Sequence, residues 1–190
     1  MKGNQGNRSR SGHLRTAAAM VLAQSFITVS LPAMAAGGDN VYLHGALVAE
    51  PCIIKAGDEV ISIGFGTIID KYLYQNIRTQ GKTFELHLEN CDLTLGKSVR
   101  VKFTGTESRA LPGLLALDGS SEAKGIAIGF ETPAAKPLAL NEKSDKLLLL
   151  NGGNIIALRA YVKAEPDAIR GQRIERGSFS AVTTFQLEYE

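Results

Sequence analysis

The sequence predicts an all-β domain of the sandwich or barrel class, held by one disulfide. Short runs of alternating apolar and polar residues recur along the chain, turn-forming residues separate them, and helical periodicity is hard to find. The runs typical of strands are 40–48, 59–68, 83–91, 98–105, 125–131, 154–164 and 176–190. Seven short strands with frequent turns are characteristic of a β-sandwich or a barrel.

The first 35 residues have the composition of a secretory signal peptide. Their basic residues are Lys2, Arg8, Arg10 and Arg15. The apolar stretch 17–31 follows, and then Ala33 and Ala35 stand in A-x-A spacing. The apolar stretch is shorter than the roughly 20 residues of a membrane-spanning helix, although a retained anchor is the alternative. We therefore expect 1–35 to be a signal peptide and the chain to be exported.

Removal of that leader changes the charge of the protein. The whole chain has 21 basic and 19 acidic residues, whereas residues 36–190 have 17 and 19, a formal net charge of −2. No basic patch remains to indicate binding of nucleic acid. The mature length suits one domain that is large enough to bury a core.

Both cysteines, Cys52 and Cys91, lie in the exported part. An even number of cysteines in an oxidising compartment predicts one disulfide. Two buried free thiols are the alternative. Two cysteines do not by themselves make a tetrahedral structural zinc site.

The first alternating run lies close to the predicted cleavage site. Val41, Leu43, Gly45 and Leu47 occupy one face of it. Such a segment either forms the first strand of its own sheet or pairs with a neighbouring molecule, because an open strand edge is a template for another chain. The pattern alone leaves both interpretations open.

The run 83–91 and the terminal run show the clearest alternation. Phe84, Leu86 and Leu88 share one face of the first, and Glu85, His87 and Glu89 share the other. In the terminal run one face holds Gly177, Phe179, Ala181, Thr183, Phe185, Leu187 and Tyr189. This strand is unusual because chain ends normally fray. The apolar runs 111–117 and 145–151 do not reveal their structure.

Groups suited to catalysis are few. The mature chain keeps only His44 and His87, and the flanking glutamates predict that His87 lies on a solvated strand face. No nucleophile elbow, P-loop or H-E-x-x-H motif is present. A copper–zinc sandwich enzyme needs more histidines, and Asp118 and Glu122 lie in polar turns. We expect no enzyme activity, no cofactor, no metal and no small-molecule substrate.

Five features follow one another along the chain: the arm "NVYLHGALV", "EPCII", the I-x-I-G-F-G stretch 61–66, "LENCD", and a terminal strand from Gly177 to the penultimate Tyr189. In this order they resemble the subunits of chaperone–usher pili, the fimbriae of Gram-negative bacteria. The resemblance covers the mature chain, and "GSFSAVTTFQLEYE" is most similar to the ends of P-pilus-type subunits. The long basic leader departs from the pattern.

The resemblance implies a pilin fold, an incomplete immunoglobulin-like β-sandwich that lacks its seventh strand. It assigns 36–47 to an N-terminal donor-strand arm and 48–190 to the pilin domain. The implied donor-strand residues are Val41, Leu43, Gly45 and Leu47. The implied groove-edge and chaperone-binding residues are Gly177, Phe179, Ala181, Phe185, Leu187, Tyr189 and Glu190.

The implied partners are a periplasmic chaperone, an outer-membrane usher and neighbouring subunits. The chaperone inserts a strand into the groove and binds the C-terminal carboxylate of Glu190. The arm of the next subunit later replaces that strand. The protein is then a structural subunit exported to the periplasm and assembled on the cell surface in support of adhesion. The alternatives are a terminating subunit at the pilus base, a tip-associated adhesin, which in this family carries an additional lectin domain, and a secreted sandwich closed by its own first strand.

Overall fold

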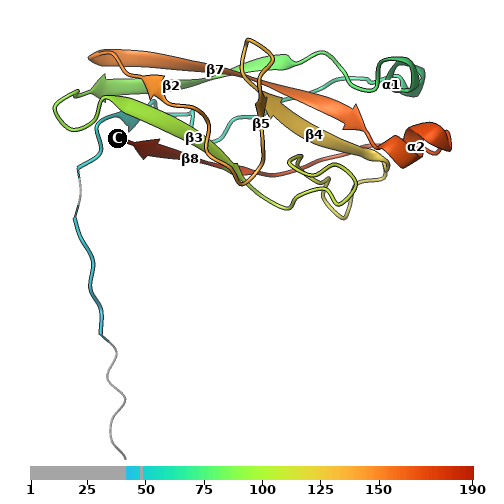
Figure 1. Ribbon diagram of the computed structural model, residues 1–190, viewed down its shortest axis with the longest axis horizontal. Helices are drawn as coiled ribbons and strands as arrows, with labels where there is room; N and C mark the ends of the chain where they lie inside the picture. The colour runs from blue at the N-terminus through green and yellow to red at the C-terminus, as the bar shows by residue number, and fades with distance from the viewer. Residues whose placement is uncertain (1–41, 48) are drawn as a thin grey trace, which may run out of the picture. The chain divides into compact units, whose positions relative to one another are not determined.

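Two antiparallel β-sheets face each other across an apolar core (Figure 1). The computed structural model describes residues 42–47 and 49–190, so the expected signal peptide and Val41 lie outside the described residues. By its internal contacts the chain falls into two units, of which the first ends at Gly45 and the second is Ala46–Glu190.

The strands are β1 (Ile53–Ile54), β2 (Lys82–Cys91), β3 (Ser98–Thr104), β4 (Ile126–Glu131), β5 (Pro137–Leu138), β6 (Leu147–Leu148), β7 (Gly152–Ala164) and β8 (Thr184–Tyr189). The five-stranded sheet has the order β1-β2-β7-β4-β5, and the three-stranded sheet has the order β6-β3-β8. The helices are α1 (Asp70–Asn76) and α2 (Pro166–Arg170). The predicted β-sandwich is confirmed.

Strands β2 and β7 form the longest pair of the five-stranded sheet, with Leu86 opposite Ile156. Successive side chains of a strand point to opposite faces. Leu86 and Leu88 are accordingly buried, whereas Glu85 and Glu89 are exposed. The two faces predicted for the run 83–91 are therefore confirmed.

His87, on the outward face of β2, is half-buried rather than fully solvated. Its Nδ1 lies 2.8 Å from Oδ2 of Asp58, and its backbone N–H donates to the same oxygen at 2.8 Å. These hydrogen bonds, the backbone one first, lower the pKa of Asp58. His87 thus ties the turn after β1 to the sheet and has a structural role.

The two sheets meet through aromatic rings. Phe103 of β3 and Phe130 of β4 stack with their ring centroids 4.3 Å apart. Phe84 of β2 meets these rings edge-on, with centroid distances of 6.2 and 6.4 Å. Because the stacked rings come from different sheets, this cluster joins the layers at the centre of the core.

Cys52 and Cys91 form the predicted disulfide. Both are buried, and the bond connects the residue before β1 to the last residue of β2. A loop of this length stabilises the fold by about 4 kcal/mol according to chain-entropy reasoning.

Several predicted elements differ from the structure. The run 59–68 forms no strand, and neither do the described residues 42–47. Of the two ambiguous apolar runs, 145–151 contributes only the short strand β6. The run 111–117 contributes only isolated bridges, from Leu115 to Glu107 and to Ile128.

The helices were not predicted because each is too short to show a period. Helix α1 buries only Leu73, and α2 buries only Ala168. One buried residue in each helix leaves no repeat at helical spacing for the sequence to reveal. In the described ranges, no helix has the length and apolar character needed to cross a membrane.

Candidate functional site

Strand β8 lies at an edge of the three-stranded sheet. Within the described chain it pairs with β3 alone, with Val99 opposite Tyr189 and Phe103 opposite Phe185. The half-buried residues of the terminal run that pack against the core are Phe179, Ala181, Phe185, Leu187 and Tyr189. The predicted terminal strand is confirmed over Thr184–Tyr189, and its second edge has no neighbouring strand among the described residues.

Before β8 the alternation continues, but polar contacts replace strand pairing. The N–H of Ser180 donates to Oγ of Ser121 at 3.1 Å, and the Oγ of Ser180 donates to Asp118 at 2.9 Å. The carbonyl of Ser180 accepts the N–H of Asp118 at 2.8 Å. One side of this segment is therefore fixed to the loop before β4.

Ser178 repeats this arrangement two residues earlier. Its N–H and its hydroxyl donate to Oε2 of Glu122 at 3.0 and 3.1 Å, and they lower the pKa of that carboxyl, the N–H more strongly. Gly177 has φ of 148°, and a Cβ at this position would lie 2.4 Å from the Cβ of Glu122. A glycine is required here by both the backbone angle and the close approach.

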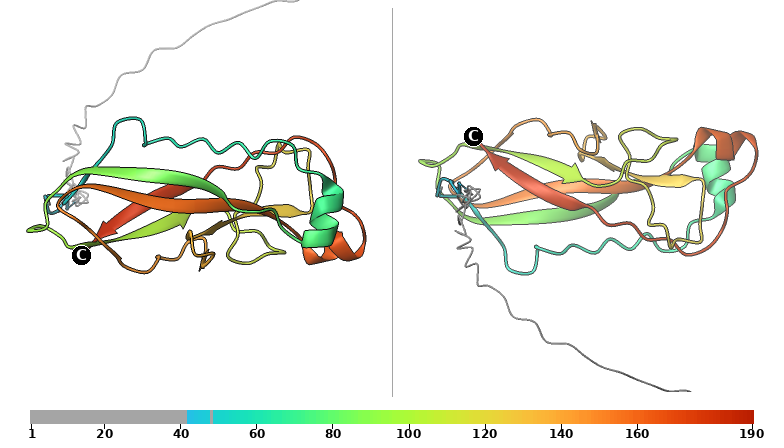
Figure 2. Two further views of the ribbon diagram at one scale, coloured as in Figure 1. Left: turned by 90° about the horizontal axis from the view of Figure 1, so that it is seen from above. Right: turned by 90° about the horizontal axis from the view of Figure 1, so that it is seen from below.

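The segment 59–68 follows β1 and runs along the sandwich to α1 (Figure 2). Ile61, Ile63 and Phe65 are half-buried against the core, while the residues between them are exposed. Within the described chain, no backbone group from Val60 to Thr67 has a backbone hydrogen-bond partner. This segment therefore alternates like a strand but lacks the pairing of one.

The segment 59–68 and the terminal run lie along the same side of the sandwich in opposite directions. At one end, a Cβ on Gly96 would meet both Pro51 and Tyr189 within 3.6 Å. At the other end, the ring centroids of Phe65 and Phe179 are 6.0 Å apart. No backbone hydrogen bond joins the two segments in the described residues. We call 59–68 and 177–189 together the open edge.

A cavity of about 290 Å³ lies at the α1 end of the open edge. Its apolar lining includes Ile68, Leu73, Ile126, Ile174 and Phe179. An ion pair between Asp70 and Arg176, with N–O distances of 2.7 and 2.9 Å, lies beside it and lowers the pKa of Asp70. Apolar lining beside unpaired backbone suits the side chain of an incoming peptide.

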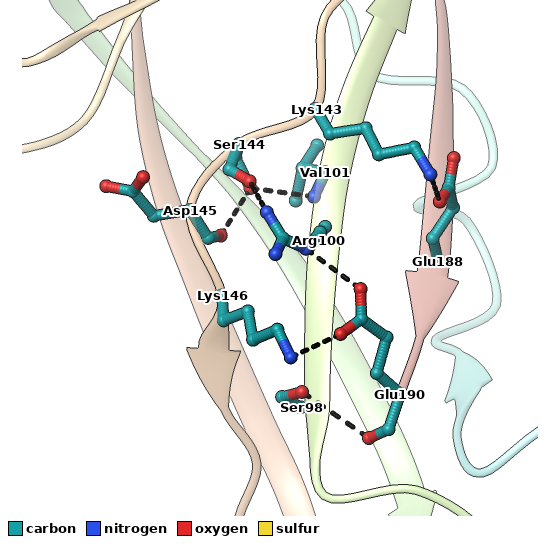
Figure 3. A network of polar contacts seen from close by, with 9 residues as sticks. All are labelled: Ser98, Arg100, Val101, Lys143, Ser144, Asp145, Lys146, Glu188 and Glu190. Atoms are coloured by element: carbon teal, nitrogen blue, oxygen red, sulfur yellow. Dashed lines mark hydrogen bonds and ion pairs between the residues drawn. The ribbon is translucent and has the colours of Figure 1, made fainter.

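Glu190 ends the open edge at the other side. Its N–H donates to the carbonyl of Ser98 at 2.9 Å, and its main-chain oxygen accepts the N–H groups of Lys97 and Ser98 at 2.8 and 3.0 Å. Its side chain pairs with Lys146 at 2.5 Å and with Arg100 at 2.9 Å (Figure 3). Lys146 first, and then Arg100, lowers the pKa of this carboxyl. The chain end is thus anchored within its own subunit.

Three of the four expected donor-strand residues, Leu43, Gly45 and Leu47, lie at the start of the described chain. Leu43 and Leu47 are 92% and 104% exposed. A Cβ on Gly45 would meet no described atom within 4 Å. Val41 lies outside the described residues.

The open edge offers unpaired N–H and C=O groups beside half-buried apolar side chains, an arrangement suited to accepting an additional strand. The described residues contain no group of three or more His, Cys, Asp or Glu placed to hold a metal ion. Sequence reasoning missed the cations around Glu190 and the Asp70–Arg176 pair, because no local pattern relates residues so far apart. The alternation of Ile61, Ile63 and Phe65 was the signal available in the sequence for the segment 59–68 of the open edge.

The chain matches the family described as Fimbrial protein over residues 41–190. It is 34% identical over 155 residues to a protein of Proteus mirabilis (strain HI4320) named "Putative minor fimbrial subunit PmfF", covering 80% of this chain and 85% of that protein. It is 31% identical over 166 residues to the fimbrial adapter PapK of Escherichia coli, covering 84% and 93%.

Solved structures show the same likeness. The P pilus rod subunit PapA superposes with a TM-score of 0.64 at 27% identity, covering 74% of this chain and all of that one. A second match is a chain from a structure of a chaperone–usher pilus, solved to explain how its rod uncoils. Its TM-score is 0.64 at 26% identity, covering 84% of this chain and 100% of that chain. This likeness confirms the predicted fold.

Proposed function

The chain belongs to the fimbrial protein family and is a subunit of a chaperone–usher fimbria, and we propose that it polymerises by exchanging strands with its neighbours. The family is structural rather than enzymatic, and a fimbrial subunit belongs to a pilus on the cell surface. Within that class we propose a structural subunit that supports adhesion.

The unpaired backbone of the open edge carries this proposal. A strand placed between 59–68 and β8 would give hydrogen-bond partners to both segments, in the manner of strand addition. It would also cover the half-buried row that includes Phe179, Phe185 and Leu187. Such a strand therefore supplies both the hydrogen bonds and the apolar contacts that one chain lacks.

The proposed donor is the arm 36–47 of the following subunit. Its apolar positions, Val41, Leu43, Gly45 and Leu47, recur with the period of a strand, so they face one side together. The exposure of Leu43 and Leu47 supports this role because both side chains are available to a partner.

Before assembly, we propose that a periplasmic chaperone occupies the same edge and that its cations bind the C-terminal carboxylate of Glu190. Gly177, Phe179, Ala181, Phe185, Leu187 and Tyr189 would then form the wall shared by both partners. The usher in the outer membrane is the proposed site of exchange. The anchoring of Glu190 to Ser98 supports this role, because it holds the chain end at a fixed position.

The test is to produce residues 36–190 in a bacterial periplasm with and without the cognate chaperone. We expect a soluble complex only with the chaperone, and we expect a peptide of residues 36–47 to displace the chaperone. A peptide with Leu43→Asp and Leu47→Asp is the matched control and should not displace it. A soluble monomer formed without chaperone, or equal displacement by both peptides, would show that the open edge does not accept the arm.

A further inference from the structure

A group of cations lies over the end of the terminal strand. Lys143 pairs with Glu188, while Lys146 and Arg100 pair with Glu190 (Figure 3). Arg100 belongs to β3, whereas both lysines come from the segment that leads into β6. Lys143 crosses β3 to reach Glu188, whereas the side chain of Glu190 extends over β3 to meet Lys146 (Figure 3). We call Lys143–Lys146 the lysine strap.

The backbone of the lysine strap is fixed to β3 through Ser144. The N–H of Ser144 donates to the carbonyl of Val101 at 2.8 Å, and its Oγ accepts the N–H of Val101 at 2.9 Å. Arg100 donates to the carbonyl of Ser144 at 2.9 Å. Ser144 is itself buried, so the two lysines project from a fixed point rather than from a loose loop.

Apolar alternation alone does not determine the register in which β8 pairs with β3. Phe185, Leu187 and Tyr189 point inward, and a slip of β8 by one residue would turn them outward. A slip by two residues keeps them inward, so the apolar pattern does not exclude it. The outward residues do distinguish it, because Gln186 is uncharged whereas Glu188 and Glu190 are charged.

We propose that Lys143, Lys146 and Arg100 are positioning residues that hold the chain end in one register and prevent it from fraying. A slip by two residues leaves one strap lysine without its carboxylate, so only the native register satisfies both lysines. This role rests on the proposed function, in which β8 is the strand beside which partner strands dock. The register of β8 then decides which apolar side chains a partner strand meets.

The test uses the subunit bound to its chaperone, with the variant Lys143→Gln/Lys146→Gln. Hydrogen exchange at the amides of 187–190 should become about three- to tenfold faster, as expected for the loss of two exposed ion pairs. The wild-type protein should lose the same protection in 1 M salt, where the Debye length is about 3 Å. Lys143→Arg/Lys146→Arg keeps the charges and should restore slow exchange.

The slip itself can be detected by cross-linking. Thr104 lies opposite Thr184, so Thr104→Cys/Thr184→Cys should cross-link in the native register. In the native register Thr104 and Gln186 are diagonal neighbours, whose Cα atoms are about 7–8 Å apart, too far for a disulfide. A slip by two residues would place them opposite each other, so Thr104→Cys/Gln186→Cys should cross-link only after the slip. We expect this second cross-link to increase in the glutamine variant.

Lys136→Gln is the matched control, because Lys136 pairs with Asp145 of the strap and not with a residue of β8. Unchanged exchange in the double glutamine variant, an equal effect of Lys136→Gln, or wild-type protection that salt does not alter would each overturn the role of the strap. Failure of the chaperone to capture even the wild-type chain would instead overturn the proposed function.

Discussion

At the scale of residues, the terminal run depends on a few close contacts that its alternation does not reveal. Gly177 fits against Glu122, and the carboxylate of Glu122 accepts both hydrogen bonds from Ser178. These contacts fix the beginning of the terminal run, just as Arg100 and Lys146 fix its end.

Gly177→Ala should destabilise the subunit. The new Cβ would overlap Glu122, and φ of 148° is unfavourable for any residue with a side chain. Overpacking of this kind costs about 1–3 kcal/mol. The thermal midpoint of the chaperone-bound subunit measures the effect, and Gly119→Ala, where a Cβ would meet nothing within 4 Å, is the control. Equal midpoints for the two variants would contradict the prediction.

The contribution of Glu122 should depend on pH. Its pKa lies below the ordinary value of 4.5 in the folded protein because it accepts the N–H and the hydroxyl of Ser178. A lowered folded-state pKa stabilises the fold above the unfolded-state pKa, and this stabilisation is lost as the pH falls through the folded-state value. Glu122→Gln should therefore lower the thermal midpoint at pH 7, and the difference from wild type should disappear in acid. Exposed Glu142→Gln is the control; a constant difference from pH 7 into acid would exclude this cause.

At the scale of elements, β8 and the segment 59–68 show the same alternation but different pairing. Strand β8 is hydrogen-bonded to β3 along one edge, whereas Val60 to Thr67 has no backbone pairing in the described chain. Half-buried side chains hold both segments against the core. Apart from the carbonyl of Gly64, which accepts a hydrogen bond from Lys82, the segment 59–68 is held by its side chains, and an added strand would supply the backbone pairing that it lacks among the described residues.

The two faces of β8 should respond differently to truncation. Leu187→Ala should destabilise the chaperone-bound subunit by about 1–2 kcal/mol, less than the loss of a fully buried leucine. Gln186→Ala should have almost no effect, because Gln186 is exposed on the other face. Urea unfolding of the two complexes compares them. A larger effect at Gln186 would mean that the register of β8 differs from the one described.

At the scale of the whole molecule, the disulfide and the aromatic cluster stabilise the sandwich from within, whereas among the described residues the open edge lacks backbone pairing between its two segments. The Phe103–Phe130 stack and the Cys52–Cys91 bond join elements of one chain. The open edge, by contrast, leaves backbone groups without partners in the described chain. A second chain is the natural source of those partners if the protein polymerises as proposed.

Gly45→Leu should leave capture by the chaperone unchanged and slow strand exchange. A Cβ at Gly45 meets no described atom within 4 Å, whereas a leucine side chain inserted into a tight site on a neighbour would cost about 1–3 kcal/mol. Exchange between purified chaperone–subunit complexes, followed on a gel, measures the rate. Ala46→Leu adds bulk to the opposite face of the arm and should exchange at the wild-type rate. If Gly45→Leu also exchanged at that rate, the glycine would not face a tight site.

The sequence by itself determined the alternation of the longer strands and the disulfide. Phe84, Leu86 and Leu88 share a face because strand geometry repeats every two residues, and this property is local. The pairing of Cys52 with Cys91 is a distant contact, but with only two cysteines in the chain there was no other pairing to consider. The expected cleavage site and the roles of the arm remain predictions.

Only the tertiary structure decided which alternating segments are paired. The run 59–68 and the terminal run have similar patterns, yet only the second has a strand beside it in the described chain. The pairing of Glu190 with Lys146 and Arg100 likewise depends on how β3 and β6 bring distant residues to one surface. Alternation reports which side of a segment is buried; hydrogen bonds and ion pairs also need a partner at the right distance, and only the folded chain supplies that partner.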